Sequence, residues 1–91
     1  MKEFNYTTSG TCSKMIHIAL NDDDTIRNIY FIGGCNGNLK GIAELAKGQK
    51  PEAIIARLKG ISCGGRPTSC PDQLACALEG IIKGEIPQEE I

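Results

Sequence analysis

Four of the five cysteines in this sequence lie within two residues of a glycine or at an expected helix start, where thiols can serve as metal ligands. They are Cys12, Cys35, Cys63 and Cys70. Tight turns around glycine let the backbone aim several sulfur atoms at one point, and the N–H groups of such turns hydrogen-bond thiolates. An expected helix start at Cys70 also favours its thiolate form. These four cysteines therefore predict a closed, tetrahedral structural zinc site.

Two other uses of the cysteines stay open at the level of sequence. The gaps between them are 22, 27 and 6 residues, unlike the paired C-x2-C knuckles of zinc ribbons, so buried or spare thiols also fit the pattern. The second alternative is a thiol redox protein in which Cys63 and Cys70 exchange, with Arg66 favouring a thiolate.

Cys76 and His17 are separate from this set. On a helix that begins at Cys70, the 100° step per residue places Cys76 on the far side, with Asp72, Glu79 and Lys83, so it is not expected as a fifth ligand. His17 lies in an apolar segment whose alternation turns its ring toward solvent or a partner.

The elements that must position these residues form an α+β pattern. β-branched and aromatic residues predict three strands at the start of the chain, which form an antiparallel meander with a polar turn between the second and third. Three helices follow and pack against the sheet. The expected strands are residues 4–8, 14–20 and 26–32, and the expected helices are residues 39–47, capped by Asn38, then 51–58 and 70–83. We expect a single domain over residues 1–86 and a loose tail over residues 87–91.

Composition limits the classes of function. The net charge is -1 with no basic stripe, which argues against direct nucleic-acid binding. No apolar run approaches a membrane span, and residues 1–8 lack the apolar core of a signal peptide, so we expect a cytoplasmic protein. Eleven glycines and few aromatic residues leave a thin core, which a metal or a second copy would stabilise. A metal-free structural homodimer is thus a further alternative.

Three ordered blocks carry a resemblance to a known family. Residues 10–14 read GTCSK, residues 33–38 read GGCNGN, and residues 63–75 read CGGRPTSCPDQLA. The chain resembles the TSCPD domain, which takes its name from the run Thr68 to Asp72. The resemblance extends over nearly the whole chain.

The resemblance implies a function linked to deoxyribonucleotide synthesis. TSCPD domains occur at the C-terminal end of adenosylcobalamin-dependent ribonucleotide reductases and as short free-standing proteins, and their four recurrent cysteines are thought to bind zinc. Those positions match Cys12, Cys35, Cys63 and Cys70. The resemblance suggests the oxidoreductase label of a ribonucleoside-diphosphate reductase. However, 91 residues cannot hold a radical barrel, and no cobalamin-binding motif is visible. We therefore expect an accessory role beside a protein partner such as a ribonucleotide reductase.

Overall fold

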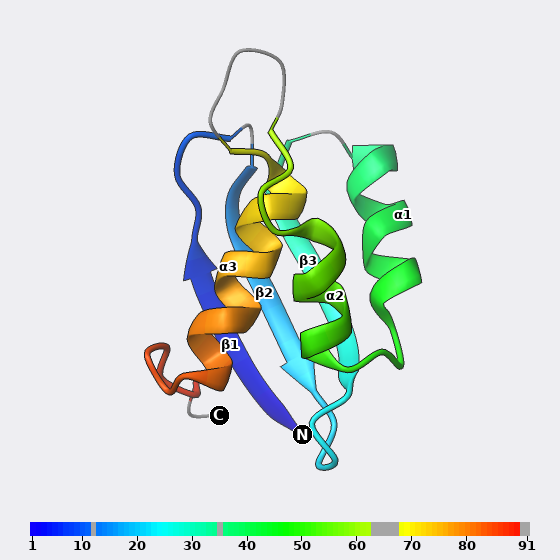
Figure 1. Cartoon of the computed structure of the whole chain (residues 1–91), viewed down its shortest axis with the longest axis vertical. Helices are drawn as coiled ribbons and strands as arrows, with labels where there is room; N and C mark the ends of the chain where they lie inside the picture. The colour runs from blue at the N-terminus through cyan, green and yellow to red at the C-terminus, as the bar shows by residue number, and fades with distance from the viewer. Residues whose placement is uncertain (12, 35, 63–67, 90–91) are drawn as a thin grey trace.

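The chain begins with a three-stranded antiparallel sheet, as its sequence predicts. A computed structural model describes residues 1–11, 13–34, 36–62 and 68–89. Strands β1 (Lys2–Thr7), β2 (Ser13–Leu20) and β3 (Ile26–Gly33) lie in the order β1-β2-β3 (Figure 1). Strand β1 starts two residues before the expected position, because Lys2 still pairs with Leu20 across the ladder.

The turn between β2 and β3 is the expected polar hairpin. The backbone N–H of Asp24 donates to the carbonyl of Asn21 at 2.9 Å, and the N–H of Asn21 donates to the carbonyl of Thr25 at 2.8 Å. Asp24 adopts a φ of 69°, a left-handed conformation that aspartate tolerates better than most residues. The three consecutive aspartates thus close a turn.

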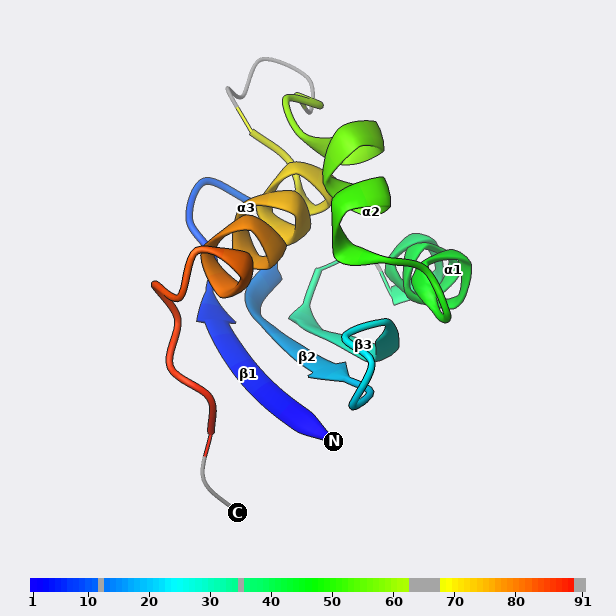
Figure 2. The ribbon, with the colours of Figure 1, turned by 60° about the horizontal axis from the view of Figure 1, so that its bottom comes forward.

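Three helices cover one face of the sheet and complete the expected α+β fold. They are α1 (Asn36–Ala46), α2 (Pro51–Leu58) and α3 (Cys70–Ile82). Helix α3 lies over β1 and β2, α2 packs beside α3, and α1 flanks β3 (Figure 2). The expected cap at Asn38 is wrong, since Asn38 is the third residue of α1. A first helical turn needs no internal partners for its N–H groups, so the helix extends back through Gly37.

The core lies between the sheet and the helices and is almost entirely aliphatic. Alternate residues of β2 and β3 point into it, and α3 contributes one stripe. The large side chains that are fully buried are Ile16, Ile18, Ile26, Leu74 and Leu78. Phe4 is the one buried aromatic side chain in the described part of the chain. The core is therefore thin, as the composition predicts, and it forms a single layer between the sheet and the helices.

The segment after α3 returns along β1. Ile86 packs against the core, and its side chain lies so close to Gly80 that a Cβ there would come within 2.9 Å of it. The backbone N–H of Glu89 donates to the carbonyl of Glu3 at 2.7 Å, on the outer edge of β1. The predicted domain end at residue 86 and the loose tail at residues 87–91 stay predictions, since residues 90–91 lie outside the described part.

Candidate metal centre

One of the four predicted ligands lies in the described part of the structure. Cys70 is the first residue of α3 and is buried, with 7% of its surface exposed. Cys12, Cys35 and Cys63 lie outside the described residues. The geometry around Cys70 and the residues that flank the other three therefore define this candidate site.

The flank of Cys12 contacts Cys70 directly. Ser13 is buried at the start of β2, and its Oγ lies 3.2 Å from the Sγ of Cys70. The hydroxyl of Thr11 lies 3.2 Å from the same Ser13 oxygen. Residues on both sides of Cys12 thus lie at the start of α3, although 57 positions separate Ser13 from Cys70 along the chain.

The flank of Cys35 joins the same end of the sheet. Gly33, the last residue of β3, is the ladder partner of Ser13. Gly33 and Gly34 have φ angles of 82° and 85°, a left-handed conformation that side chains disfavour, so two glycines end this strand. The chain therefore leaves β3 beside Ser13, immediately before Cys35.

The flank of Cys63 is tied to the start of α3 by side-chain hydrogen bonds. The hydroxyl of Ser69 donates to the carbonyl of Ile61 at 2.6 Å. The backbone N–H of Gly60 donates to the carboxylate of Asp72 at 2.6 Å. The described segments on either side of residues 63–67 are thereby held together.

The run Thr68 to Asp72 is also a helix-capping device. Ser69 is the N-cap of α3, and its Oγ accepts from the backbone N–H of Asp72 at 3.2 Å. Pro71 occupies a position in the first turn, where a missing N–H costs nothing. Asp72 adds a negative charge at the positive end of the helix. Sequence reasoning missed this role, although a serine three residues before an acid is a readable capping signal.

Gln73 connects the segment before Cys12 with the segment before α3. No local sequence pattern predicted this role. It is buried, and its Oε1 accepts from the backbone N–H of Ser9 at 3.2 Å. Its Nε2 donates to the hydroxyl of Thr68 at 3.1 Å. A Cβ at Gly10 would come within 3.0 Å of the Thr68 methyl group, so the two loops also approach closely there. Ser9, Thr68, Asp72 and Gln73 form what we call the loop clamp.

The pKa values of Asp72 and Cys76 are shifted in opposite directions. Hydrogen bonds from the Thr68 hydroxyl and the Gly60 N–H lower the pKa of Asp72 below its ordinary value. Burial, followed by the charges of Asp72 and Glu79, raises the pKa of the Cys76 thiol. Cys76 therefore resists forming a thiolate. Its exclusion from the ligand set stays a prediction.

His17 lies on the open face of the sheet and not among the residues that surround Cys70. Its side chain is half-buried, and its ring is oriented by β1. Nδ1 lies 2.7 Å from the Asn5 Oδ1 and Nε2 lies 3.2 Å from the Glu3 carboxylate. The Tyr30 ring lies 6.3 Å away on β3, in the same cross-strand row. The groups that orient His17 are distant in sequence, so its local pattern could not reveal them.

Cys70, with a hydroxyl beside its sulfur, has the chemistry of a metal ligand supported by an outer hydrogen bond. Within residues 1–11, 13–34, 36–62 and 68–89, no three His, Cys, Asp or Glu side chains are grouped closely enough to hold a metal ion. No helix in those ranges is long and apolar enough to cross a bilayer.

Comparison with known families gives a match over most of the chain. The family model described as TSCPD domain matches residues 2–82. Searches among curated proteins and among solved structures found no match to this chain. The matched range contains all three strands, all three helices and the loop clamp.

Proposed function

This chain belongs to the TSCPD domain family, and we propose that it is a zinc-stabilised interaction module. In this proposal the thiolates of Cys12, Cys35, Cys63 and Cys70 hold one zinc ion. The module works in the cytoplasm as an accessory to nucleotide reduction, through contact with a protein partner such as a ribonucleotide reductase.

The observation that supports the proposal most strongly is the convergence of four separate segments at one end of the sheet. Ser13 contacts Cys70 and pairs with Gly33, while Ser69 bonds Ile61. Each of these residues is Cys70 itself or lies within two positions of one of the four cysteines. Segments so close together need little further movement to share a metal ion.

The residues also fit zinc chemically. Zinc prefers thiolate sulfur in closed structural sites, and when bound it would supply a cross-link between segments that are far apart in the sequence. The Ser13 hydroxyl beside Cys70 is suited to donate a hydrogen bond to a thiolate. The buried position of Cys70 favours a shielded ligand over a thiol that must meet an external partner.

The test is the zinc content and stability of the purified protein and two matched serine variants. Native mass spectrometry should find one zinc per chain in the wild type and in Cys76→Ser, and none in Cys70→Ser. Loss of zinc should lower the free energy of unfolding by more than about 3 kcal/mol, since a structural site contributes its binding energy to folding. A zinc-free wild type that keeps its fold in EDTA would refute the proposal.

Thiol titration separates the redox alternative from the same samples. If two thiols per chain disappear on mild oxidation and return with dithiothreitol, exchange between Cys63 and Cys70 is favoured instead. Thiols that become titratable only after zinc is removed favour the zinc site.

A further inference from the structure

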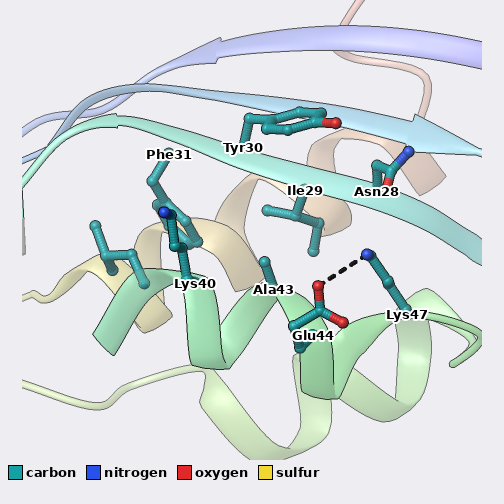
Figure 3. A pocket seen from close by; sticks show the side chains of 9 residues that line it. Asn28, Ile29, Tyr30, Phe31, Lys40, Ala43, Glu44 and Lys47 are labelled. Atoms are coloured by element: carbon teal, nitrogen blue, oxygen red, sulfur yellow. Dashed lines mark hydrogen bonds and ion pairs between the residues drawn. The ribbon is translucent and has the colours of Figure 1, made fainter. Parts of the chain in front are cut away.

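A groove runs between the outer edge of β3 and helix α1, away from the start of α3. Its volume is about 550 Å³, and Figure 3 shows the strand forming one wall and the helix the other. Phe31 and Ile29 point from β3 toward the helix, and Ala43 faces them from α1. The floor of the groove is therefore apolar, and its two walls are a strand edge and a helix.

The strand wall carries backbone groups that can accept another chain. Strand β3 pairs with β2 on one side, so alternate residues direct their N–H and C=O groups outward on the other. At Ile26 the protein already uses this edge: Ile26 N–H donates to the carbonyl of Gln49 at 2.9 Å, and Gly48 N–H donates to the carbonyl of Ile26 at 2.8 Å. Within the described ranges, no backbone hydrogen bond continues that pairing along residues 27–33.

The helix wall gives the groove a positive rim. Lys40, Glu44 and Lys47 line it from α1. Lys47 is paired with Glu44 at 2.9 Å, whereas Lys40 makes no ion pair with any residue that the structure describes. The net charge of this wall is therefore positive, and it is centred on Lys40.

These features point to an extended chain as the occupant. A helix satisfies its own backbone groups and could not pair with the edge of β3, whereas a strand could. A second copy of β3, with the sequence IRNIYFIG, has no acidic residue that could neutralise Lys40. An acidic extended segment satisfies both the edge and the rim.

We propose that the β3–α1 groove binds an extended, acidic segment of a partner polypeptide, which adds a strand to the edge of β3. Apolar side chains on one face of that segment pack on Ile29, Phe31 and Ala43, and an acidic side chain on the same face pairs with Lys40. The proposal names the partner surface of the interaction module proposed above, and it does not require the zinc ion.

The test uses two blocked peptides, Val-Thr-Val-Thr-Glu and Val-Thr-Val-Thr-Lys, titrated into isotopically labelled full-length protein. The first, third and fifth residues of an extended peptide share one face, so both valines and the final charged side chain can point toward α1 together. The acidic peptide should shift the backbone amide signals of β3 and α1 and bind roughly tenfold more tightly than the basic one. Lys40→Glu should reverse that preference, while Lys50→Glu, an exposed charge change outside the groove, should leave it unchanged. An acidic peptide N-methylated at alternate residues should lose binding, because strand pairing needs its N–H groups.

Three results would overturn the inference. They are the absence of shifts in β3 and α1 at millimolar peptide, equal binding of the N-methylated peptide, and peptide-free signals of β3 that change with protein concentration. The last result would assign the edge to a second copy, as in the predicted homodimer. Zinc content measured on the same sample keeps the two proposals distinct, because peptide binding by a zinc-free protein would refute the metal site alone.

Discussion

The two ends of the sheet are held by similar polar groups in different surroundings. At the hairpin end, the N-terminal amine pairs with Asp22 at 2.8 Å, and the Asp22 side chain is 92% exposed. At the other end, Ser13, Ser69 and Gln73 are all buried. When an exposed ion pair forms, each charge gives up hydrogen bonds with water to gain its partner. Such a pair therefore contributes little to the free energy of unfolding. A buried polar group that loses its partner keeps the full cost of its desolvation.

This difference explains where the fold depends on polar contacts. The hairpin end closes on a tight turn and has the buried Ile26 beside it. At the end with Cys70, described residues outside the strands are tied to α3 and its N-cap by hydrogen bonds between side chains and backbone. Breaking one polar contact should therefore have unequal effects at the two ends.

The largest effect among the polar contacts is expected for Gln73→Ala. The change leaves the backbone N–H of Ser9 without its side-chain acceptor and opens a polar cavity, so the free energy of unfolding should fall by about 2 kcal/mol. Urea denaturation measures this loss. Gln49→Ala, which removes an exposed amide side chain, is the matched control, and equal effects of the two changes would contradict the loop clamp.

A smaller, pH-dependent effect is expected for Asp72→Asn. The variant should lose about 1 kcal/mol at neutral pH, since the neutral amide lacks the favourable charge at the helix start and is a weaker acceptor for Gly60. The pKa of Asp72 is lower in the folded protein than its ordinary value of 3.8. The wild-type advantage should therefore be complete above pH 3.8 and decline as the pH falls through the folded pKa.

Urea midpoints of the wild type and Asp72→Asn between pH 7 and pH 2 check this prediction. Plotted against pH, the two sets of urea midpoints should differ by a constant amount near neutral pH and converge in acid. A gap that stays constant to pH 2 would mean that the carboxylate charge of Asp72 contributes nothing.

The smallest effect is expected at the hairpin end. The double variant Asp22→Asn, Asp24→Asn removes the partners of the N-terminal amine and of Lys2, both on the surface. Its urea midpoint should match that of the wild type in moderate salt, because exposed pairs are screened. A clear loss of stability that persists in high salt would contradict the contrast between the two ends.

The regular elements could be predicted because their signals are local. The β-branched run around Ile16 and Ile18 and the aliphatic stripe of Leu74 and Leu78 each identify an element and its buried face. The start of α1 was misplaced by three residues, because polar residues and glycine fit a first helical turn as well as a loop. The exact end of a helix depends on packing against distant residues, and a short stretch of sequence does not contain that information.

Contacts between distant segments were beyond local patterns. The pairing of Ser13 with Cys70 and the orientation of His17 by Glu3 both depend on strand register and on the placement of α3. The groove beside Lys40 exists because α1 follows the edge of β3. A cysteine pattern can indicate zinc chemistry, but only the fold can bring the flanking segments together.

X-ray absorption at the zinc edge of the purified protein shows directly whether one zinc ion joins the four cysteine segments. We expect four sulfur neighbours at about 2.3 Å from a single zinc ion and no nitrogen or oxygen ligand. Zinc bound by oxygen or nitrogen, or by fewer than four sulfurs, would contradict it.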